Sequence, residues 1–429
     1  MTHPRSVRSR LRRISFLRNA WGDLRLASLY LRSLPHMARL WTRPRRAVRY
    51  SHASTEERHL HVVFITSSAR ARELKLAHAA RLCGDRVTLV STRPCEGTAA
   101  YFDAQHVARD CWEALDLLDE LRPDVVHLFA NYGIAYLLPV LLAAPVPVVY
   151  DPYDCMRGMF APQYRRSWLD LAAERLCLSR AAHLCARSLE PLYLRRRFGY
   201  RLPPTTYFPD YCWGTPHGRA PRVVNEGERL RVVYCGGIWP EDRYAPEEYG
   251  YAQFIQLGRT LAKQGIELHL YPAPWPVREP FERFFALYLA EADTNRFFHL
   301  HRPLPPEKLR DELAQYDAAL FLYGGHSQVM HGRITEAKMH YSAANKLFDY
   351  IEAGLVVLLH GGWHQVGLVR HYGVVVIPQD LERLRPVLVS ALASGYRANP
   401  DACIERHARR LHAMYVDVAA DPHLEWKAS

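Results

Sequence analysis

The stretch Ser342-Ala-Ala-Asn-Lys-Leu-Phe-Asp-Tyr-Ile-Glu-Ala-Gly354 runs directly into the apolar segment Leu355-Val-Val-Leu-Leu-His360. Ser342 suits a helix N-cap and Gly354 a left-handed stop, so the first part predicts a three-turn helix. The apolar segment has the length and composition of a buried strand. A helix that leads at once into a buried strand is typical of α/β folds with parallel sheets.

The same alternation of apolar runs and helical stretches continues through most of the chain, which indicates stacked β-α-β units. The strands predicted in the first half are 61–66, 86–91, 124–129, 146–151, 182–186 and 206–209. Those in the second half are 231–235, 267–271, 296–300, 318–323, 356–360 and 374–377. We therefore predict an α/β fold with two Rossmann-like, doubly wound parallel-sheet domains that face each other across a ligand-binding cleft.

The domain boundaries follow from a change in composition. Residues 213–229 are polar and rich in Gly and Pro, as linkers are. This places one domain at 58–212 and a second at 230–395. The last segment, 396–429, is predicted to contain a helix that can cross back to the first domain.

The charge of the chain is concentrated at its beginning. Residues 1–50 hold 13 arginines and one acid, a net charge of +12, whereas 51–429 hold 43 basic and 43 acidic residues. Within the segment 1–57, which we call the arm, apolar residues recur every three or four positions and so share one helical face. These residues are Val7, Leu11, Ile14, Leu17, Trp21 and Leu24.

This pattern predicts an amphipathic helix that lies on an anionic membrane, and hence a cytoplasmic protein held peripherally at the inner face of the membrane. A disordered basic tail, or an arm packed on the body, is the alternative. We do not expect a nucleic-acid partner, because no known reader fold accompanies the arginines.

Cysteine and histidine spacing predicts neither disulfides nor a metal site. The nine cysteines are scattered, odd in number and never spaced as Cys-x-x-Cys, which favours a reducing compartment. The histidine pairs His59/His61 and His299/His301 each lie on one side of a strand. No third ligand follows at a recognisable spacing, so we expect packing or surface roles.

Lys346 and Asp349 are the first candidates for chemistry. The start of their helix would offer free backbone N–H groups to a pyrophosphate, and Lys346 would add a cation. Asp349 shares its face and can accept hydrogen bonds from two ribose hydroxyls. An ordinary amphipathic helix with a Lys/Asp surface pair explains the spacing equally well.

Two loops at predicted strand ends supply further candidates. In the loop 324–340, Arg333 can clamp a diphosphate with two hydrogen bonds, and a solvated insertion is the alternative. In the loop 151–157, Asp154 can deprotonate or orient an acceptor hydroxyl. An aspartate that caps the following turn is the alternative there.

Three motifs together resemble one enzyme family. Asn345-Lys-Leu-Phe-Asp-Tyr-Ile-Glu-Ala-Gly-Leu-Val-Val resembles the K-x-F-E-Y-x-x-x-G-x-P-V segment of GT-B glycosyltransferases, particularly glycosyltransferase family 4. Arg122-Pro-Asp-Val-Val-His127, followed by Val148-Val-Tyr-Asp-Pro-Tyr-Asp154, is similar to the strands of that family's first domain. Val232-Val-Tyr-Cys-Gly-Gly237 resembles the strand that opens its second domain. The resemblance covers residues 60–415.

The resemblance implies that the second domain binds a nucleotide-diphosphate sugar and the first domain its acceptor, with retention of configuration and with neither a metal nor another cofactor. Asp154 and Arg333 are then the catalytic candidates. The donor side would comprise Gly236, Gly237, Arg243, Tyr323, Ser342, Asn345, Lys346 and Asp349. The acceptor side would comprise Ser67, Ser68 and Tyr153. We expect transfer to a hydroxyl of a lipid-linked or cell-envelope glycan.

The chain also departs from the family pattern. Tyr341 stands where many members have a glutamate, and Ile238 and Trp239 replace a usual basic pair, with Arg243 the nearest cation. In the first domain, Ser67-Ser68 replaces a glycine-rich loop, and Tyr153 replaces a histidine. Two alternatives therefore stay open: a catalytically weakened GT-B domain that acts as a membrane-bound assembly partner, and a sugar-nucleotide epimerase.

Overall fold

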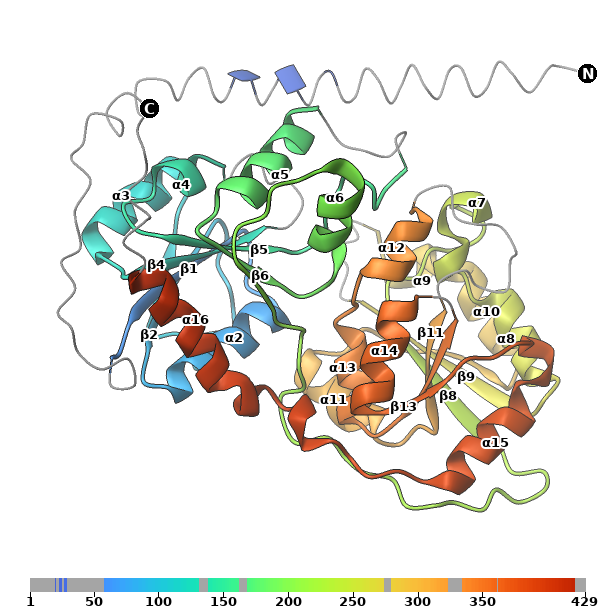
Figure 1. Cartoon of the computed structure of the whole chain (residues 1–429). Helices are drawn as coiled ribbons and strands as arrows, with labels where there is room; N and C mark the ends of the chain where they lie inside the picture. Colours follow the sequence, from blue (N-terminus) through green and yellow to red (C-terminus); the bar gives the residue numbers. More distant parts are fainter. Residues whose placement is uncertain are drawn as a thin grey trace, which may run out of the picture. The chain divides into compact units, whose positions relative to one another are not determined.

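A computed structural model describes residues 58–130, 138–161, 168–273, 279–322, 334–360 and 362–420, with Ala20, Asp23, Leu24, Ala27 and Ser28. The chain divides into two compact units. The first unit takes the chain up to Pro209 and again from His407, and the second unit takes Asp210–Arg406. Each unit is a parallel sheet with helices packed on it (Figure 1).

The first unit contains a seven-stranded sheet in the order β3-β2-β1-β4-β5-β6-β7. Its strands are β1 (His61–Thr66), β2 (Arg86–Ser91), β3 (Ala104–Val107), β4 (Val125–Ala130), β5 (Val148–Pro152), β6 (His183–Ala186) and β7 (Thr205–Tyr207). Its helices are α2 (Ala71–Leu82), α3 (Cys111–Leu121), α4 (Leu138–Ala143), α5 (Trp168–Arg180), α6 (Glu190–Phe198) and α16 (Ala408–Ala420).

The edge strand β3 was not predicted from the sequence. Its four residues, Ala-Gln-His-Val, alternate between half-buried and exposed. The strand therefore lacks the apolar run that identified its neighbours, which are buried on both faces.

The second unit contains a six-stranded sheet in the order β10-β9-β8-β11-β12-β13. Its strands are β8 (Leu230–Gly236), β9 (Ile266–Pro272), β10 (Phe298–Leu300), β11 (Ala318–Leu322), β12 (Val356–His360) and β13 (Val374–Val376). Its α-helices are α7 (Pro246–Tyr249), α8 (Ile255–Ala262), α9 (Phe281–Phe284), α10 (Ala286–Thr294), α11 (Pro306–Leu313), α12 (Glu336–Tyr341), α13 (Lys346–Glu352), α14 (Trp363–Tyr372) and α15 (Leu384–Ser394).

Both sheets are doubly wound, so the order of strands reverses at one point in each. The reversal lies between β1 and β4 in the first unit and between β8 and β11 in the second. Loops leaving the carboxyl ends of two such strands run in opposite directions, and ligands of α/β proteins bind there.

A buried arginine organises the first unit. Arg72 on α2 is 1% exposed, and its Nε donates to Asp151 Oδ2 at the end of β5 over 2.8 Å. Its Nη1 donates to the carbonyl of Phe208 over 2.9 Å. Burial opposes ionisation of Asp151, but Arg72 and His127 outweigh it and lower the pKa of the Asp151 carboxyl. The ion pair therefore holds helix, sheet and the segment after β7 together.

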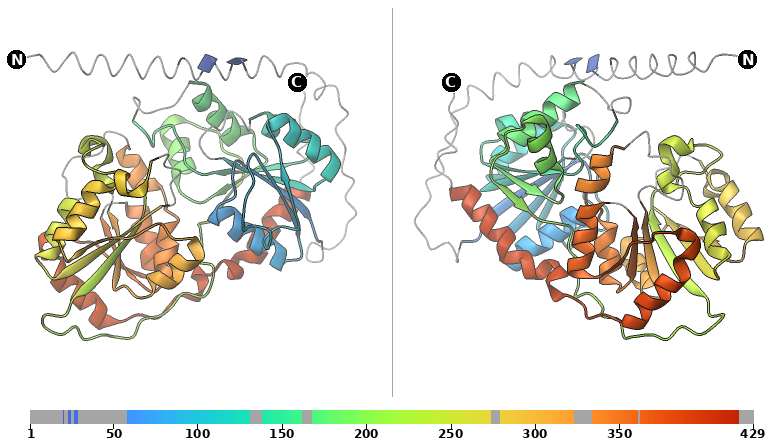
Figure 2. Two further views of the ribbon diagram at one scale, coloured as in Figure 1. Left: turned by 180° about the vertical axis from the view of Figure 1, so that it is seen from behind. Right: turned by 45° about the vertical axis from the view of Figure 1, so that its right-hand side comes forward.

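The C-terminal helix α16 is part of the first unit and lies alongside α2 (Figures 1 and 2). The hydroxyl of Tyr415 and Nδ1 of His127 on β4 are 2.6 Å apart. His412 Nδ1 lies 2.9 Å from Asp85 Oδ2. The last part of the described chain is thus fastened to the sheet and to the turn before β2.

Most of the predicted arm lies outside the described residues, including Val7, Leu11, Ile14, Leu17 and Trp21. The described part includes Asp23, whose carboxylate accepts a hydrogen bond from the backbone N–H of Leu169 over 3.2 Å. All nine cysteines are free thiols. Among the helices that the structure describes, none has both the length and the apolar character needed to cross a membrane.

Replacing Arg72 with leucine should destabilise the first unit by roughly 3–5 kcal/mol, because Asp151 would keep a buried charge without its main partner. The free energy of unfolding can be measured by hydrogen exchange in urea, followed on peptides from β4 and β5. Arg109→Leu is the control, since Arg109 is 88% exposed in its pair with Glu113 and should change stability by under about 0.5 kcal/mol. Similar losses in the two variants would contradict the role assigned to Arg72.

Candidate functional site

The carboxyl end of β8 carries the glycines predicted to approach a phosphate. Gly236 has a φ of +144°, which side chains rarely adopt. A Cβ at this position would also collide with Nζ of Lys346. The backbone conformation therefore favours glycine at 236, and the absence of a side chain there leaves room for the Lys346 ammonium.

Lys346, the first residue of α13, places its ammonium at the reversal point of the second sheet. Its Nζ donates to the hydroxyl of Tyr234 on β8 over 3.1 Å and lies 4.2 Å from the centre of that ring. It also lies 5.4 Å from the ring centre of Phe321 on β11. The Tyr234 hydroxyl in turn donates to the carbonyl of Gly237 over 3.0 Å. The ammonium thus contacts both strands at the place where ligands bind in such sheets.

Asp349 lies one turn after Lys346 and is half-buried. Burial is the main reason that the pKa of the neighbouring Cys235 thiol rises to about 12. The charge of Lys346 opposes this rise, and the charge of Asp349 adds to it. Both charges therefore act on the same strand end. The backbone N–H of Cys235 donates to the hydroxyl of Tyr350 over 3.0 Å, which fixes α13 to β8. The structure thus brings Lys346 against Gly236 and both Lys346 and Asp349 near Cys235, and their role in donor binding stays a prediction.

The predicted three-turn helix from Ser342 is wrong. Two helices occupy this region, and the second, α13, begins only at Lys346. Ser342 ends the first helix, α12, and its buried hydroxyl donates to the carbonyl of Lys338. A serine hydroxyl competes with the backbone in this way, so Ser342 caps no following helix. Asn345 precedes α13 in helical conformation without a side-chain cap, whereas Gly354 does adopt the predicted left-handed conformation, with a φ of +70°.

Arg243 forms an ion pair with Glu279 and does not contact Lys346. Its Nη1 donates to Glu279 over 2.6 Å, and its Nη2 donates to the carbonyl of Arg283 over 2.8 Å. Its contact with a donor stays a prediction. Tyr323 and Arg333 lie outside the described residues.

In the first unit, Ser67 and Ser68 follow β1, at the reversal point of that sheet. The carbonyl of Ser67 accepts a hydrogen bond from the hydroxyl of Thr92 over 3.0 Å. That of Ser68 accepts one from the Thr66 hydroxyl over 3.3 Å. This turn is therefore held by two threonines, where the resemblance implies a glycine-rich loop.

Tyr153 and Asp154 follow β5 and share one partner, Arg187. The Arg187 guanidinium pairs with Asp154 Oδ1 at 2.8 Å and donates from Nε to the carbonyl of Tyr153 over 2.7 Å. It also lies 4.0 Å from the ring centre of Tyr153. This pairing holds Asp154 in place, which suits orientation of an acceptor hydroxyl better than removal of its proton.

Two buried glutamates that the sequence analysis missed hold the loop that follows. Glu190 accepts a hydrogen bond from the backbone N–H of Cys155 over 2.7 Å. Glu174 accepts from the N–H groups of Met156 and Arg157. Burial raises the pKa of Glu174 to about 7. Both acids come from later helices, so local spacing gave no signal for them.

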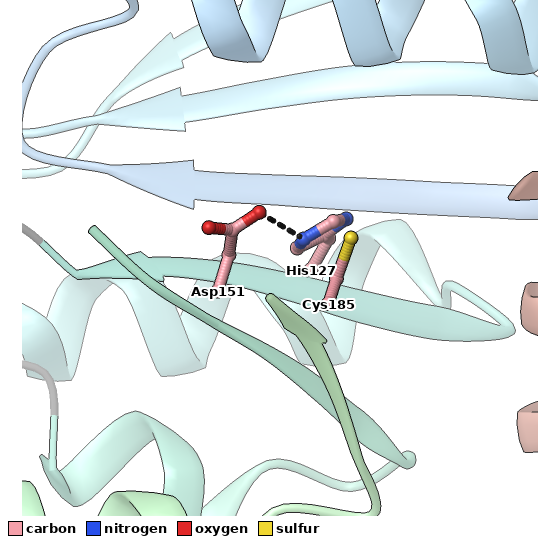
Figure 3. A group of neighbouring side chains, drawn as sticks. All are labelled: His127, Asp151 and Cys185. Carbon is pink, nitrogen blue, oxygen red and sulfur yellow. Dashed lines mark ion pairs between the residues drawn. The ribbon is translucent and has the colours of Figure 1, made fainter. Parts of the chain in front are cut away.

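His127, Asp151 and Cys185 converge from three neighbouring strands, and their potential ligand atoms lie within 4.8 Å of one another (Figure 3). The guanidinium of Arg72 contacts this group: its Nη2 lies 2.8 Å from Asp151 Oδ2 and 3.7 Å from Cys185 Sγ. The Arg72 guanidinium is thus the cation that pairs with this group in the structure.

No protein-family model matches the chain, and no curated protein matches it in sequence. Solved structures do match its fold. Anabaena Alr3699/HepE, determined in complex with UDP-glucose, aligns with a TM-score of 0.54 and 13% identity over 84% of this chain and 96% of its own. Sucrose-phosphate synthase from Thermosynechococcus elongatus aligns with a TM-score of 0.52 and 12% identity, over 85% and 96%. S. aureus MnaA, determined with UDP, aligns with a TM-score of 0.50 and 9% identity, over 82% and 95%.

Structural alignments at identities this low show a shared fold and nothing more. The two parallel sheets, their strand orders and the alignment of more than four-fifths of the chain agree in this respect. The chain therefore has the two-domain GT-B fold.

Proposed function

We propose that the protein is a glycosyltransferase that uses a nucleotide-diphosphate sugar as donor. The observation that carries the proposal is the ammonium of Lys346 against Gly236, at the reversal point of the second sheet. On this proposal Asp349, one turn away, accepts hydrogen bonds from a ribose. HepE, a protein of the same fold, was determined with UDP-glucose, so UDP is the first nucleotide to test.

The proposed chemistry rests on cations of the chain itself. The diphosphate gains negative charge as the glycosyl bond breaks, and a fixed ammonium stabilises that charge more in the transition state than in the ground state. We assign this role to Lys346, with Arg333 as a second clamp on sequence grounds. On this account neither a metal nor another cofactor takes part, and the configuration of the sugar is retained, as the family resemblance implies.

For the acceptor we propose a hydroxyl of a lipid-linked or cell-envelope glycan. Asp154, held by Arg187, would orient that hydroxyl, with Tyr153, Ser67 and Ser68 nearby in sequence or at the same edge of the sheet. The arginines of residues 1–50 would hold the protein on anionic lipid at the cytoplasmic face of the membrane. This part of the proposal rests on the sequence.

One observation favours a catalytically weakened protein as the second candidate. The ring of Tyr341 packs edge-on against Trp363, with ring centres 5.2 Å apart. An aromatic pair thus occupies the position where the resemblance implies a glutamate in contact with the reacting sugar.

A turnover assay tests the proposal directly. Purified protein is incubated with UDP-, ADP-, GDP- and dTDP-sugars, with and without polyprenyl-phosphate-linked glycans, and the free nucleoside diphosphate is measured. We expect release of one nucleoside diphosphate that increases with acceptor. An epimerase would instead yield a new nucleotide sugar without acceptor. A weakened partner would bind nucleotide but produce neither, and either of these results would contradict the transferase.

Asp349→Ala should weaken binding of the nucleoside diphosphate by about ten- to a hundredfold, because charge-assisted hydrogen bonds are worth roughly 1.5–3 kcal/mol. Lys346→Met should weaken the binding of UDP more than the binding of UMP, since it removes the charge that we expect to face the outer phosphate. Titration calorimetry measures both effects. Asp293→Ala, an exposed change on α10 of the same unit, is the control. Unchanged affinity in Asp349→Ala would remove this residue from the site.

A further inference from the structure

Strands β9 and β10, with His301 directly after β10, bring three histidines and a glutamate close together in the second unit. His269 on β9 pairs in register with His299 on β10, and their rings stack with centres 4.3 Å apart. Glu267 precedes His269 by two residues on the same face. One ring nitrogen of each of these histidines and a carboxylate oxygen of Glu267 lie within 4.8 Å of one another. The ligands come from two strands, so their sequence spacing does not show them.

Two features of this group suit a bound cation. His269 Nε2 lies 3.5 Å from Glu267 Oε2, close to the roughly 3.3 Å between two ligands that are each about 2.0–2.1 Å from a tetrahedral zinc ion. His299 Nε2 is buried and has no hydrogen-bond partner among the described residues. A buried polar atom left without a partner is uncommon and often marks the place of a bound ion or water.

The outer atoms of these side chains are held by neighbours. His269 Nδ1 lies 3.0 Å from His301 Nε2, which leaves His269 Nε2 directed at Glu267. Arg229 Nη1 donates to Glu267 Oε1 over 2.9 Å and leaves Oε2 for another partner. Partners of this kind orient metal ligands in proteins. The Arg229 side chain is 51% exposed, so it competes only weakly with a cation.

We propose that Glu267, His269 and His299 bind one first-row divalent metal ion of the Zn²⁺ type, with water as the fourth ligand. Two imidazoles and a carboxylate are the ligand set that such ions prefer. The stacked rings must turn toward the ion, which closes the remaining separation between their nitrogens. The ion would fasten the short edge strand β10 to β9 and so stabilise the second unit. This role is independent of sugar transfer.

The test uses the full chain, stripped with EDTA and dialysed at pH 7.5. Zn²⁺ is titrated by calorimetry, and Co²⁺ is added to report the ligands through its visible spectrum. The variants are His299→Ala and Glu267→Gln, the second of which keeps the shape of the side chain in case the first fails to fold. His371→Ala, at an exposed histidine on α14, is the matched control.

We expect one Zn²⁺ per chain in wild type and control, with affinity at least tenfold lower in both variants. The melting temperature should rise with Zn²⁺ in wild type and control but not in the variants. Three results would overturn the proposal: absence of binding, equal affinity in all four proteins, or a Co²⁺ spectrum with thiolate charge-transfer bands, which would assign the ion to cysteines elsewhere.

Discussion

The contact between the Lys346 ammonium and Gly236 is the constraint on which the candidate site depends. The absence of a side chain at 236 lets Nζ, carried by the first residue of α13, lie against the end of β8. Tyr350 ties α13 to β8 through Cys235, and Tyr234 ties the ammonium to the loop that begins at Gly237. A positive charge fixed before a ligand arrives need not be reorganised when charge develops on a leaving group. This is the property that a diphosphate site requires.

The first unit also contains a fixed cation, but it is used differently. Arg72 is buried and donates hydrogen bonds to Asp151 and to the carbonyl of Phe208, so its charge stabilises the first unit. Arg187, nearer the carboxyl edge, holds Asp154 and the carbonyl of Tyr153. The first unit thus uses its buried ion pair for stability, next to the proposed acceptor loop. In the second unit the ammonium of Lys346 lies at the end of a strand.

The sequence predicted elements correctly where a single local pattern, such as an apolar run or a helical spacing, identified them. Most strands are largely buried runs of apolar residues, so all but one of the strands could be predicted. Strand β3 was missed because its four residues alternate between half-buried and exposed. Lys346 and Asp349 were found because they lie one turn apart on a single helix. Ser342 was misassigned because a serine between two short helices can serve either one. Tyr234, Arg187 and the cluster of Glu267, His269 and His299 depend on contacts between distant segments, which local spacing cannot reveal.

A crystal structure of the protein with UDP would show where the diphosphate binds, whether or not the protein turns over. We expect phosphate oxygens within hydrogen-bond distance of Lys346 Nζ and of the backbone at Gly236 or Gly237, with the ribose hydroxyls on Asp349. A diphosphate bound elsewhere, with the Lys346 ammonium still seated between Tyr234 and Gly236 and facing no ligand, would contradict this expectation.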